Sequence, residues 1–411
     1  MKARCTECGT RYSMDSIRYE CRCGGLLELV QDFRGVDAEQ LKREFAKRLG
    51  ERHTPLASGV WRYKELIAPE LPLEALVTKG EGNTGLYSPP AVTSYAGCRR
   101  LWLKALGENP SGSFKDHGMT AAVSHGRFLG FRRFACSSTG NTSSSLAMYA
   151  ALMGGEAHVY VPEGTVSENK VLQTLAYGAV VHRFAGTYDD GIRFLREQAG
   201  ELGLYVGNSV NPFRIEGQKS IIYETAQDLS WQLPDWIVLP GGALSNVSAL
   251  GKGLRDLYEL GFIPRLPRVA VVQAEGASPF HRMMEAGAAE LVPEPAPSTR
   301  ASALNIGHPP SWRKAALVLQ ETKGVTVAVT DEDILNAKAV VDASGVGCEP
   351  ASAAAVAGLR RLVSHGIIDR EETAVCLLTG HLLKDTDAVG AYHLGGGPEA
   401  LYANKMNRVR L

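Results

Sequence analysis

Short apolar runs alternate with segments of helical length along most of the chain. The runs predicted to form strands are Arg100–Lys104, Phe134–Cys136, His158–Val161, Val180–Phe184, Trp236–Leu239, Arg268–Gln273 and Ala374–Leu378. The segments predicted to form helices are Met119–Leu129, Ser143–Met153, Glu168–Tyr177, Asp189–Glu201 and Gln218–Leu229. This alternation predicts an α/β fold with a mostly parallel sheet and helices on both faces. In such sheets ligands bind beyond the carboxyl ends of strands, so the loops that follow strands are the first candidates for a site.

The first fifty or so residues have a different pattern. Two cysteine pairs occur here, each followed by a glycine, and a charged amphipathic helix is predicted at Asp37–Leu49. The cysteines are Cys5, Cys8, Cys21 and Cys23. Cysteine pairs on two glycine-containing turns are how small zinc ribbons supply four thiolates. The second pair is one residue shorter than the usual spacing, so a zinc ribbon and a ribbon that folds without metal remain equally good interpretations.

Composition excludes several classes of function. The 411 residues carry 44 lysines and arginines against 44 aspartates and glutamates, so no overall field attracts nucleic acid or an anionic membrane. No apolar run is long enough to span a bilayer, and the N-terminus lacks the apolar segment of a signal peptide. We expect a cytoplasmic protein with reduced cysteines, and a homodimer as the default for soluble oligomers.

Three loops that follow predicted strands carry unusual residues. Ser137–Thr142 places hydroxyls, amides and backbone N–H groups at the start of a helix, which suits a carboxylate or a phosphate as well as it suits a simple polar cap. Pro240–Asn246 is glycine-rich and also precedes a helix, but it matches neither a Walker loop nor GxGxxG, so it favours a small phosphate group. Leu377–His381 ends an apolar strand in a hydroxyl and a glycine, and by itself says little.

The segment Asn109–Asp116 places one lysine directly after a turn of small residues. Ser113 is a plausible N-cap for the helix that follows, so Lys115 would lie in the first turn, where the helix dipole disfavours a cation. Taken alone, Lys115 is best explained as a surface lysine. A lysine, a hydroxyl-rich loop, a phosphate-type loop and a terminal hydroxyl together describe a pyridoxal phosphate site, because a desolvated amine becomes nucleophilic near neutral pH.

Several motifs, in order along about 300 residues, give the chain a family resemblance. They are Glu81–Thr84, Asn109–Asp116, Ser138–Thr142, Asn208–Lys219, Pro240–Asn246, Glu349–Ala354 and Thr379–Asp385. In these motifs the chain resembles the threonine synthase family, pyridoxal-phosphate enzymes of fold type II, the tryptophan synthase β-like fold. The cysteine-bearing N-terminus is similar to the leader of some members.

The resemblance implies a fold of two parallel-sheet α/β domains with the cofactor between them, preceded by the cysteine-rich ribbon. The ribbon and its helix would occupy residues 1–53. The large, cofactor-binding domain would comprise residues 54–130 and 226–411, and the small domain residues 131–225.

The resemblance also implies roles for particular residues. Lys115 matches the Schiff-base lysine, Asn141 the contact to the cofactor's ring hydroxyl, and Thr379 the hydroxyl beside the ring nitrogen. The residues that match the cofactor's phosphate loop are Gly242, Ala243, Leu244, Ser245 and Asn246. Those expected to bind the substrate's carboxylate or phosphate are Ser138, Thr139, Thr142, Asn208, Ser209 and Arg214. For the last three, helix capping and surface charge are an equally good explanation.

The implied reaction converts O-phospho-L-homoserine and water to L-threonine and phosphate by γ-elimination and β-replacement. Two departures from the family pattern bear on the substrate. Ala243 and Ser245 stand in a loop that usually reads Gly-Asn-x-Gly-Asn, which is tolerable if their φ angles stay negative. His117 stands where arginine is common, and a lone histidine is more often structural.

Rival interpretations remain open at this point. A related lyase such as cysteate synthase or threonine dehydratase would use the same scaffold. A regulatory or inactive homologue would not need the lysine, the asparagine and the threonine identified above. A zinc-ribbon nucleic-acid protein explains only the first fifty residues.

Overall fold

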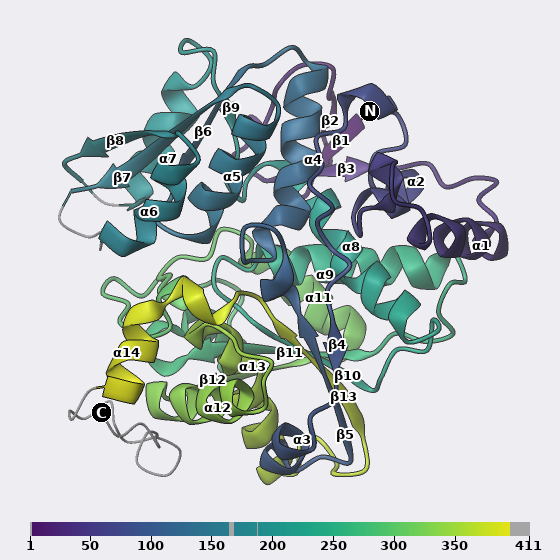
Figure 1. Ribbon diagram of the computed structural model, residues 1–411, viewed down its shortest axis with the longest axis vertical. Helices are drawn as coiled ribbons and strands as arrows, with labels where there is room; N and C mark the ends of the chain where they lie inside the picture. The colour runs from purple at the N-terminus through teal and green to yellow at the C-terminus, as the bar shows by residue number, and fades with distance from the viewer. Residues whose placement is uncertain (1, 164–167, 187, 395–411) are drawn as a thin grey trace. The chain divides into compact units, whose positions relative to one another are not determined.

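The computed structural model describes residues 2–163, 168–186 and 188–394 (Figure 1). The chain divides into two compact units. Unit 1 contains the residues up to Asn83, Asn109–Glu224 and Lys252–Phe262. Unit 2 contains Thr84–Glu108, Thr225–Gly251 and the chain from Ile263 onward. The domain boundaries predicted from the sequence stay a prediction, because compactness alone does not establish a domain.

Unit 1 begins with a small antiparallel sheet in the order β2-β1-β3. Its strands are β1 (Lys2–Cys5), β2 (Arg11–Ser13) and β3 (Leu27–Val30). The alternation of exposed and buried residues along β1 places Ala3 and Cys5 inside. Helix α1 (Ala38–Leu49) follows as predicted, with the side chain of Asp37 accepting a hydrogen bond from the Gln40 backbone N–H. A short helix, α2 (Lys64–Ile67), comes next.

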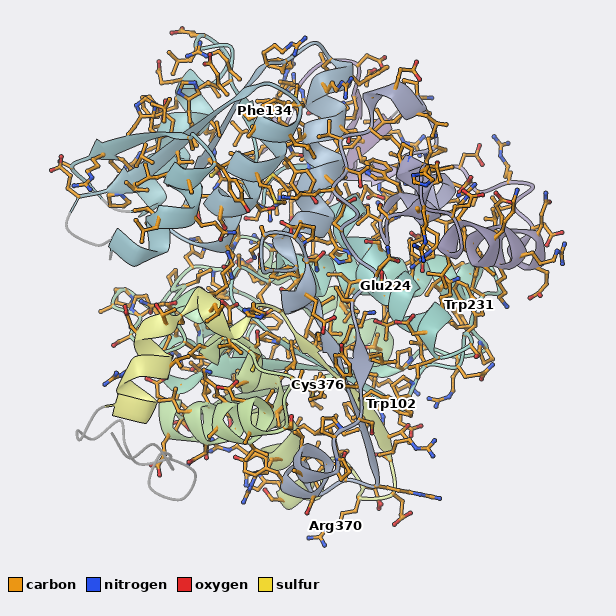
Figure 2. All side chains as sticks on the ribbon, viewed as in Figure 1. Trp102, Phe134, Glu224, Trp231, Arg370 and Cys376 are labelled. Atoms are coloured by element: carbon orange, nitrogen blue, oxygen red, sulfur yellow. The ribbon has the colours of Figure 1, made fainter. Side chains whose placement is uncertain are left out.

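The second sheet of unit 1 is wholly parallel, in the order β8-β7-β6-β9. Its strands are β6 (Arg133–Ser137), β7 (Glu156–Pro162), β8 (Val180–Phe184) and β9 (Tyr205–Val206). The helices are α4 (Lys115–Phe128), α5 (Asn141–Leu152), α6 (Glu168–Ala176), α7 (Tyr188–Gln198) and α8 (Pro212–Asp228). Phe134 on β6 is fully buried (Figure 2), and a Cβ at Gly126 of α4 would lie 2.6 Å from its ring. The helix and the sheet therefore pack tightly here.

Unit 2 is built on a six-stranded sheet in the order β12-β11-β10-β13-β5-β4. The parallel strands are β5 (Arg100–Ala105), β10 (Trp236–Pro240), β11 (Arg268–Ala274), β12 (Val325–Val329) and β13 (Thr373–Leu378); β4 (Leu86–Tyr87) is antiparallel at the edge. The helices are α3 (Pro90–Ala96), α10 (Pro279–Glu285), α11 (Trp312–Thr322), α12 (Asp331–Ala343), α13 (Pro350–Ser364) and α14 (Thr386–Leu394). Helix α9 (Ser245–Glu259) begins in unit 2, and its residues from Lys252 onward belong to unit 1.

Helix α13 lies at the centre of the unit 2 core. Every residue from Pro350 to Leu359 is buried, and half of them are alanine. The helix contacts β10, β11, β12 and β13, where Cys376 of β13 is fully buried (Figure 2). A Cβ at Gly358 would lie 2.4 Å from Val272 on β11. The small side chains thus let a helix lie very close to a sheet.

The predicted α/β fold with parallel sheets is confirmed, and all seven predicted strands are present. Two helix starts were predicted too late by four residues or more. Helix α4 begins at Lys115 rather than Met119, and α8 at Pro212 rather than Gln218. The early turns of α8 contain the buried polar residues Arg214 and Glu216, so apolar periodicity could not reveal them. Within the described ranges, no helix combines the length and apolar character needed to cross a membrane.

Candidate functional site

The turn before α4 holds Lys115 at the first position of the helix. Gly112 has a φ of 87° and its N–H donates to the Asn109 carbonyl at 2.7 Å, which closes the turn. The N-cap residue is Phe114, so the prediction that Ser113 is the N-cap was wrong by one residue. Phe114 has helical backbone angles and its side chain cannot cap, whereas Ser113 Oγ accepts from the Lys115 N–H at 3.4 Å. Lys115 lies within the first turn as predicted.

Asp116 anchors this turn, a role the sequence interpretation missed. Its carboxylate accepts hydrogen bonds from the Ser111 N–H at 2.7 Å, from Ser111 Oγ at 2.6 Å and from Ser145 Oγ of α5 at 2.5 Å. Asp116 is fully buried, and this burial raises its pKa to about 6 despite the three donors. Lys115 is therefore attached to a turn that is fixed from two sides.

Lys115 itself is half-buried rather than fully exposed to solvent. Its Nζ lies 3.9 Å from the centroid of the Phe114 ring, within the range of a cation–π contact. An aromatic wall lowers the hydration of the ammonium group. The surface-lysine interpretation is therefore weaker than it was from the sequence.

The loop after β6 presents backbone N–H groups next to open space. Helix α5 begins at Asn141, and its N-cap is Gly140. A Cβ at Gly140 would meet nothing within 4 Å, so this end of the helix is accessible. The loop is shaped by its own hydroxyls, since Ser143 Oγ donates to the Gly140 carbonyl at 2.7 Å and Ser138 Oγ accepts from the Gly140 N–H at 3.3 Å. The positive end of a twelve-residue helix beside open space can bind a carboxylate or phosphate.

The segment from Val206 to Arg214 joins β9 to α8 and contains three predicted substrate residues. The Asn208 side chain bonds to both backbone groups of Ser137, accepting at 3.1 Å and donating at 2.9 Å, so it holds this segment to the end of β6. Arg214 is 1% exposed, and its Nη1 donates to the Gly207 carbonyl at 3.0 Å. Ser209 is half-buried. Surface charge therefore does not explain Arg214.

Unit 2 contains the glycine-rich loop before α9. Gln273 of β11 donates to the Gly241 carbonyl at 2.9 Å, and the Asn246 side chain donates to the Pro240 carbonyl at 2.7 Å. Leu244 has a φ of 63°, whereas Ala243 and Ser245 are not among the described residues with positive φ. The condition under which those two substitutions are tolerable is therefore met. The sequence did not predict that Gln273 holds this loop, because Gln273 is 32 positions from Gly241 along the chain.

Thr379, also in unit 2, follows β13 and faces the first turn of α13. Its Oγ1 lies 3.0 Å from Ser352 Oγ, which also accepts from the Gly380 N–H at 2.8 Å. The Glu349 N–H donates to the Gly380 carbonyl at 3.0 Å. Ser352 is the residue that fixes the threonine hydroxyl, and it lies within a sequence motif to which no role had been given.

His117 has a structural setting. It is fully buried on α4, and its Nδ1 lies 2.7 Å from Ser220 Oγ of α8. The contact between His117 and Ser220 joins α4 to α8.

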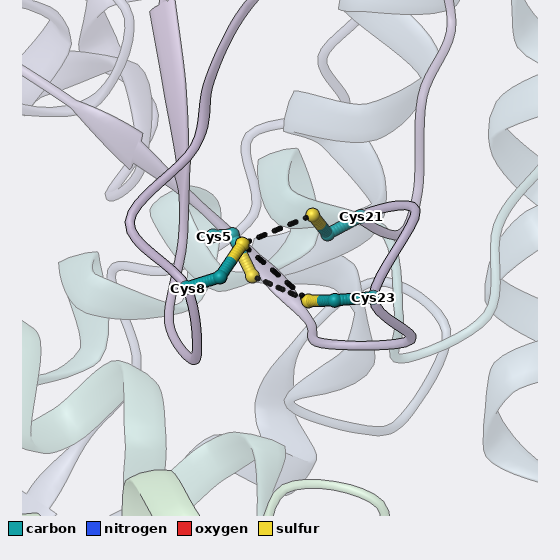
Figure 3. Close-up of side chains that lie close together, drawn as sticks. All are labelled: Cys5, Cys8, Cys21 and Cys23. Atoms are coloured by element: carbon teal, nitrogen blue, oxygen red, sulfur yellow. Dashed lines mark hydrogen bonds between the residues drawn. The ribbon is translucent and has the colours of Figure 1, made fainter.

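The four N-terminal cysteines converge into a cluster that could bind a metal ion (Figure 3). All four sulfur atoms lie within 4.8 Å of one another, and the Cys5–Cys23 and Cys8–Cys21 pairs are each 3.5 Å apart. All four are free thiols. A Cβ at Gly25 would lie 2.7 Å from Cys5 Sγ, so the shortened second turn depends on a glycine to approach the cluster.

Unit 1 thus contains Lys115, the loop at 138–142 and the segment at 206–214, and unit 2 contains the loop at 242–246 and Thr379. The family model described as pyridoxal-phosphate dependent enzyme matches residues 77–380. The chain belongs to this family of pyridoxal-phosphate enzymes.

Relatives of this pyridoxal-phosphate enzyme are similar over nearly their whole length. Threonine synthase of Methanocaldococcus jannaschii is 41% identical over 94% of each chain. Threonine synthase of Methanosarcina acetivorans is 42% identical over 94% of this chain and 93% of its own. The solved structure of threonine synthase from Escherichia coli matches with a TM-score of 0.74, at 17% identity, and covers 98% of this chain and 95% of that one. The enzyme therefore has the type II fold and is a pyridoxal-phosphate-dependent lyase.

Proposed function

We propose that this enzyme is a threonine synthase, which converts O-phospho-L-homoserine and water to L-threonine and phosphate. The observation that carries the proposal is the half-buried Lys115 at the start of α4, next to a turn that Asp116 fixes through Ser111. The threonine synthases that are 41% and 42% identical over most of their length support the same reaction.

The residues expected to hold pyridoxal phosphate fit the cofactor chemically. A left-handed residue, Leu244, directly before the start of α9 is the backbone form of an anion-binding nest, and this suits the cofactor's phosphate. Asn141 would contact the ring hydroxyl, and Thr379, paired with Ser352, would contact the ring nitrogen. When bound, pyridoxal phosphate supplies an electron sink that stabilises negative charge at the substrate carbon bearing the amino group.

The chain's own residues bind the substrate and move protons. The Lys115 amine would carry protons at Cα and Cβ, since it is the half-buried amine at the first position of α4. The α5 N-terminus, with Ser138, Thr139 and Thr142, would bind the substrate carboxylate. Thr379 is a neutral hydroxyl, which cannot protonate a ring nitrogen as a carboxylic acid would, and this favours elimination and replacement over transamination.

Arg214 favours a phosphorylated substrate. A buried guanidinium held to the carbonyl of Gly207, which directly precedes Asn208 and Ser209 in the chain, would offer charge-assisted donors to a phosphate, and a dehydratase acting on threonine has no need of them. The test is product analysis with O-phospho-L-homoserine, O-phospho-L-serine and L-threonine in parallel. Phosphate and threonine are expected from the first alone. Phosphate from O-phospho-L-serine alone would indicate a cysteate-synthase-type activity, and ammonia from threonine would indicate a dehydratase.

We also propose that the cysteine cluster binds structural zinc. Four thiolates around tetrahedral zinc, with Zn–S bonds of about 2.3 Å, lie about 3.8 Å apart, close to the 3.5 Å of the Cys5–Cys23 and Cys8–Cys21 pairs. Elemental analysis of the purified enzyme should give one zinc per chain, and none in a Cys8→Ser, Cys21→Ser double variant. The free thiols also support a reducing, cytoplasmic location. A homodimer is the expected assembly, and light scattering coupled to size-exclusion chromatography would test it.

A further inference from the structure

The loop between the two halves of the cysteine cluster lies against the segment that contains the substrate-phosphate residues. Cys8 and Cys21 are 13 positions apart, and their sulfurs meet at 3.5 Å. Between them, Met14 is buried and Tyr19 is half-buried. Tyr19 contacts Val206 of β9, and Met14 contacts His125 of α4, all within unit 1. This arrangement places the ribbon beside the segment from Val206 to Arg214.

Tyr19 satisfies a backbone group at the open edge of a sheet. Strand β9 is the edge strand beside β6, and on its inner side the Gly207 N–H donates to the Ala135 carbonyl at 2.7 Å. Because successive N–H groups of a strand point in opposite directions, the Val206 N–H points away from β6. Tyr19 Oη accepts this N–H at 2.7 Å. Val206 is two residues before Asn208.

Met14 reaches the same segment through His125. The Met14 carbonyl lies 3.1 Å from His125 Nε2, and His125 Nδ1 lies 2.9 Å from Tyr205 Oη. A carbonyl only accepts, so Nε2 carries the proton and Nδ1 accepts from the tyrosine. The His125 ring stacks on Phe213, with 3.6 Å between centroids and 13° between planes. Phe213 directly precedes Arg214, so this stacking contact holds the end of the segment that carries Arg214.

Hydrogen bonds within the segment from Val206 to Arg214 join its two ends. Asn211 donates from its side chain to the Val206 carbonyl at 2.8 Å and accepts from the Phe213 N–H at 2.9 Å. Arg214 Nη1 donates back to the Gly207 carbonyl at 3.0 Å. A displacement at Val206 is therefore transmitted to the Arg214 guanidinium.

We infer that Tyr19 is a positioning residue for the segment that binds the substrate phosphate, and that metal in the cysteine cluster holds Tyr19 in place. The inference rests on the proposed function for the role of Asn208, Ser209 and Arg214. Metal closes the loop that carries Tyr19 and lowers its conformational freedom, because in small metal-bound domains binding energy is also folding energy. Loss of metal would release Tyr19 from Val206 and loosen the phosphate-binding segment.

The test compares four forms of the enzyme loaded with cofactor: wild type, wild type stripped of metal by a chelator, Tyr19→Phe, and Tyr258→Phe as the control. Tyr258 lies on α9 and is 49% exposed, so its hydroxyl has no comparable role. Amide exchange of a peptide spanning Val206–Arg214 reports the segment directly. Competitive inhibition by inorganic phosphate and the KM for O-phospho-L-homoserine report its use.

Tyr19→Phe and metal removal are both expected to speed exchange at Val206 and to raise the phosphate inhibition constant and KM about fivefold, the worth of one hydrogen bond. In Tyr19→Phe, kcat, metal content and the visible absorption of bound pyridoxal phosphate should stay as in the control. Unchanged exchange would overturn the inference, and so would faster exchange with unchanged phosphate inhibition. If wild type releases no phosphate from O-phospho-L-homoserine, the proposed function fails, and the exchange measurement still decides whether metal and Tyr19 hold the segment.

Discussion

Asp116 allows a sharp test of how the turn at Lys115 is held. Burial raises the pKa of its carboxyl group from 3.8 to about 6, even though three hydrogen bonds favour the charged form. For an acid whose folded pKa lies above its unfolded pKa, the folded state binds the proton more tightly. Stability is then full below pH 4, falls as the pH rises to about 6, and stays lower above that pH.

The size of the effect follows from the shift of about two units. At pH 8 the ionised carboxylate costs about 3 kcal/mol relative to a neutral group of the same shape. Asparagine is such a group. Its oxygen can accept the Ser111 N–H, and its amide can donate to Ser111 Oγ and Ser145 Oγ, because hydroxyl groups rotate. We therefore expect Asp116→Asn to be more stable than wild type at pH 8, by up to about 3 kcal/mol, and equal to it at pH 4.

The assay is urea unfolding of both proteins at several pH values between 4 and 8, in cofactor-free enzyme so that ligand binding does not contribute. Ser145→Ala removes one donor to the carboxylate, so it should steepen the pH dependence, whereas Ser364→Ala at the exposed end of α13 should leave it unchanged. If Asp116→Asn is less stable than wild type at pH 8, the prediction is refuted, because the ionised carboxylate would then stabilise the folded state.

Three further predictions concern other parts of the enzyme. Lys115→Ala should lower phosphate release about 10³-fold or more in a phosphate assay and abolish the visible absorption of bound cofactor. Retained turnover would show that Lys115 is not the catalytic lysine. Burial lowers the pKa of His125 to about 4, so its contribution to stability is full above pH 6.5. About 3 kcal/mol of stability is lost as the pH falls from 6.5 towards 4, and His125→Gln should reduce this loss in thermal unfolding measured at several pH values. Leu244→Gly should relieve about 1 kcal/mol of strain from the left-handed backbone but lose about 3 kcal/mol of stability from the deleted buried side chain. The net loss of stability is measurable by urea unfolding, and the control Ser245→Gly should change stability by less than about 1 kcal/mol.

Elements with a local apolar signature could be predicted from the sequence, as strand β8 was to the residue. The start of α8 could not, because Arg214, Glu216 and Gln218 are polar residues that the fold buries, so the usual separation of faces is missing. The same limit applies to the site. Lys115 stands out by its neighbours in sequence, whereas the hydrogen bond of Ser145 to Asp116 joins residues 29 positions apart and depends on how two helices pack.

The dense packing of α13 limits how this enzyme can be redesigned. Its first turn carries Ser352, which fixes the Thr379 hydroxyl, while further along the helix Gly358 leaves no room for even a methyl group beside Val272. The helix cannot be shifted along its axis to retune the first turn without a collision at the other end. Under the proposed function, a different partner for the cofactor ring therefore requires other side chains at 352 or 379, on a backbone that has almost no freedom to adapt.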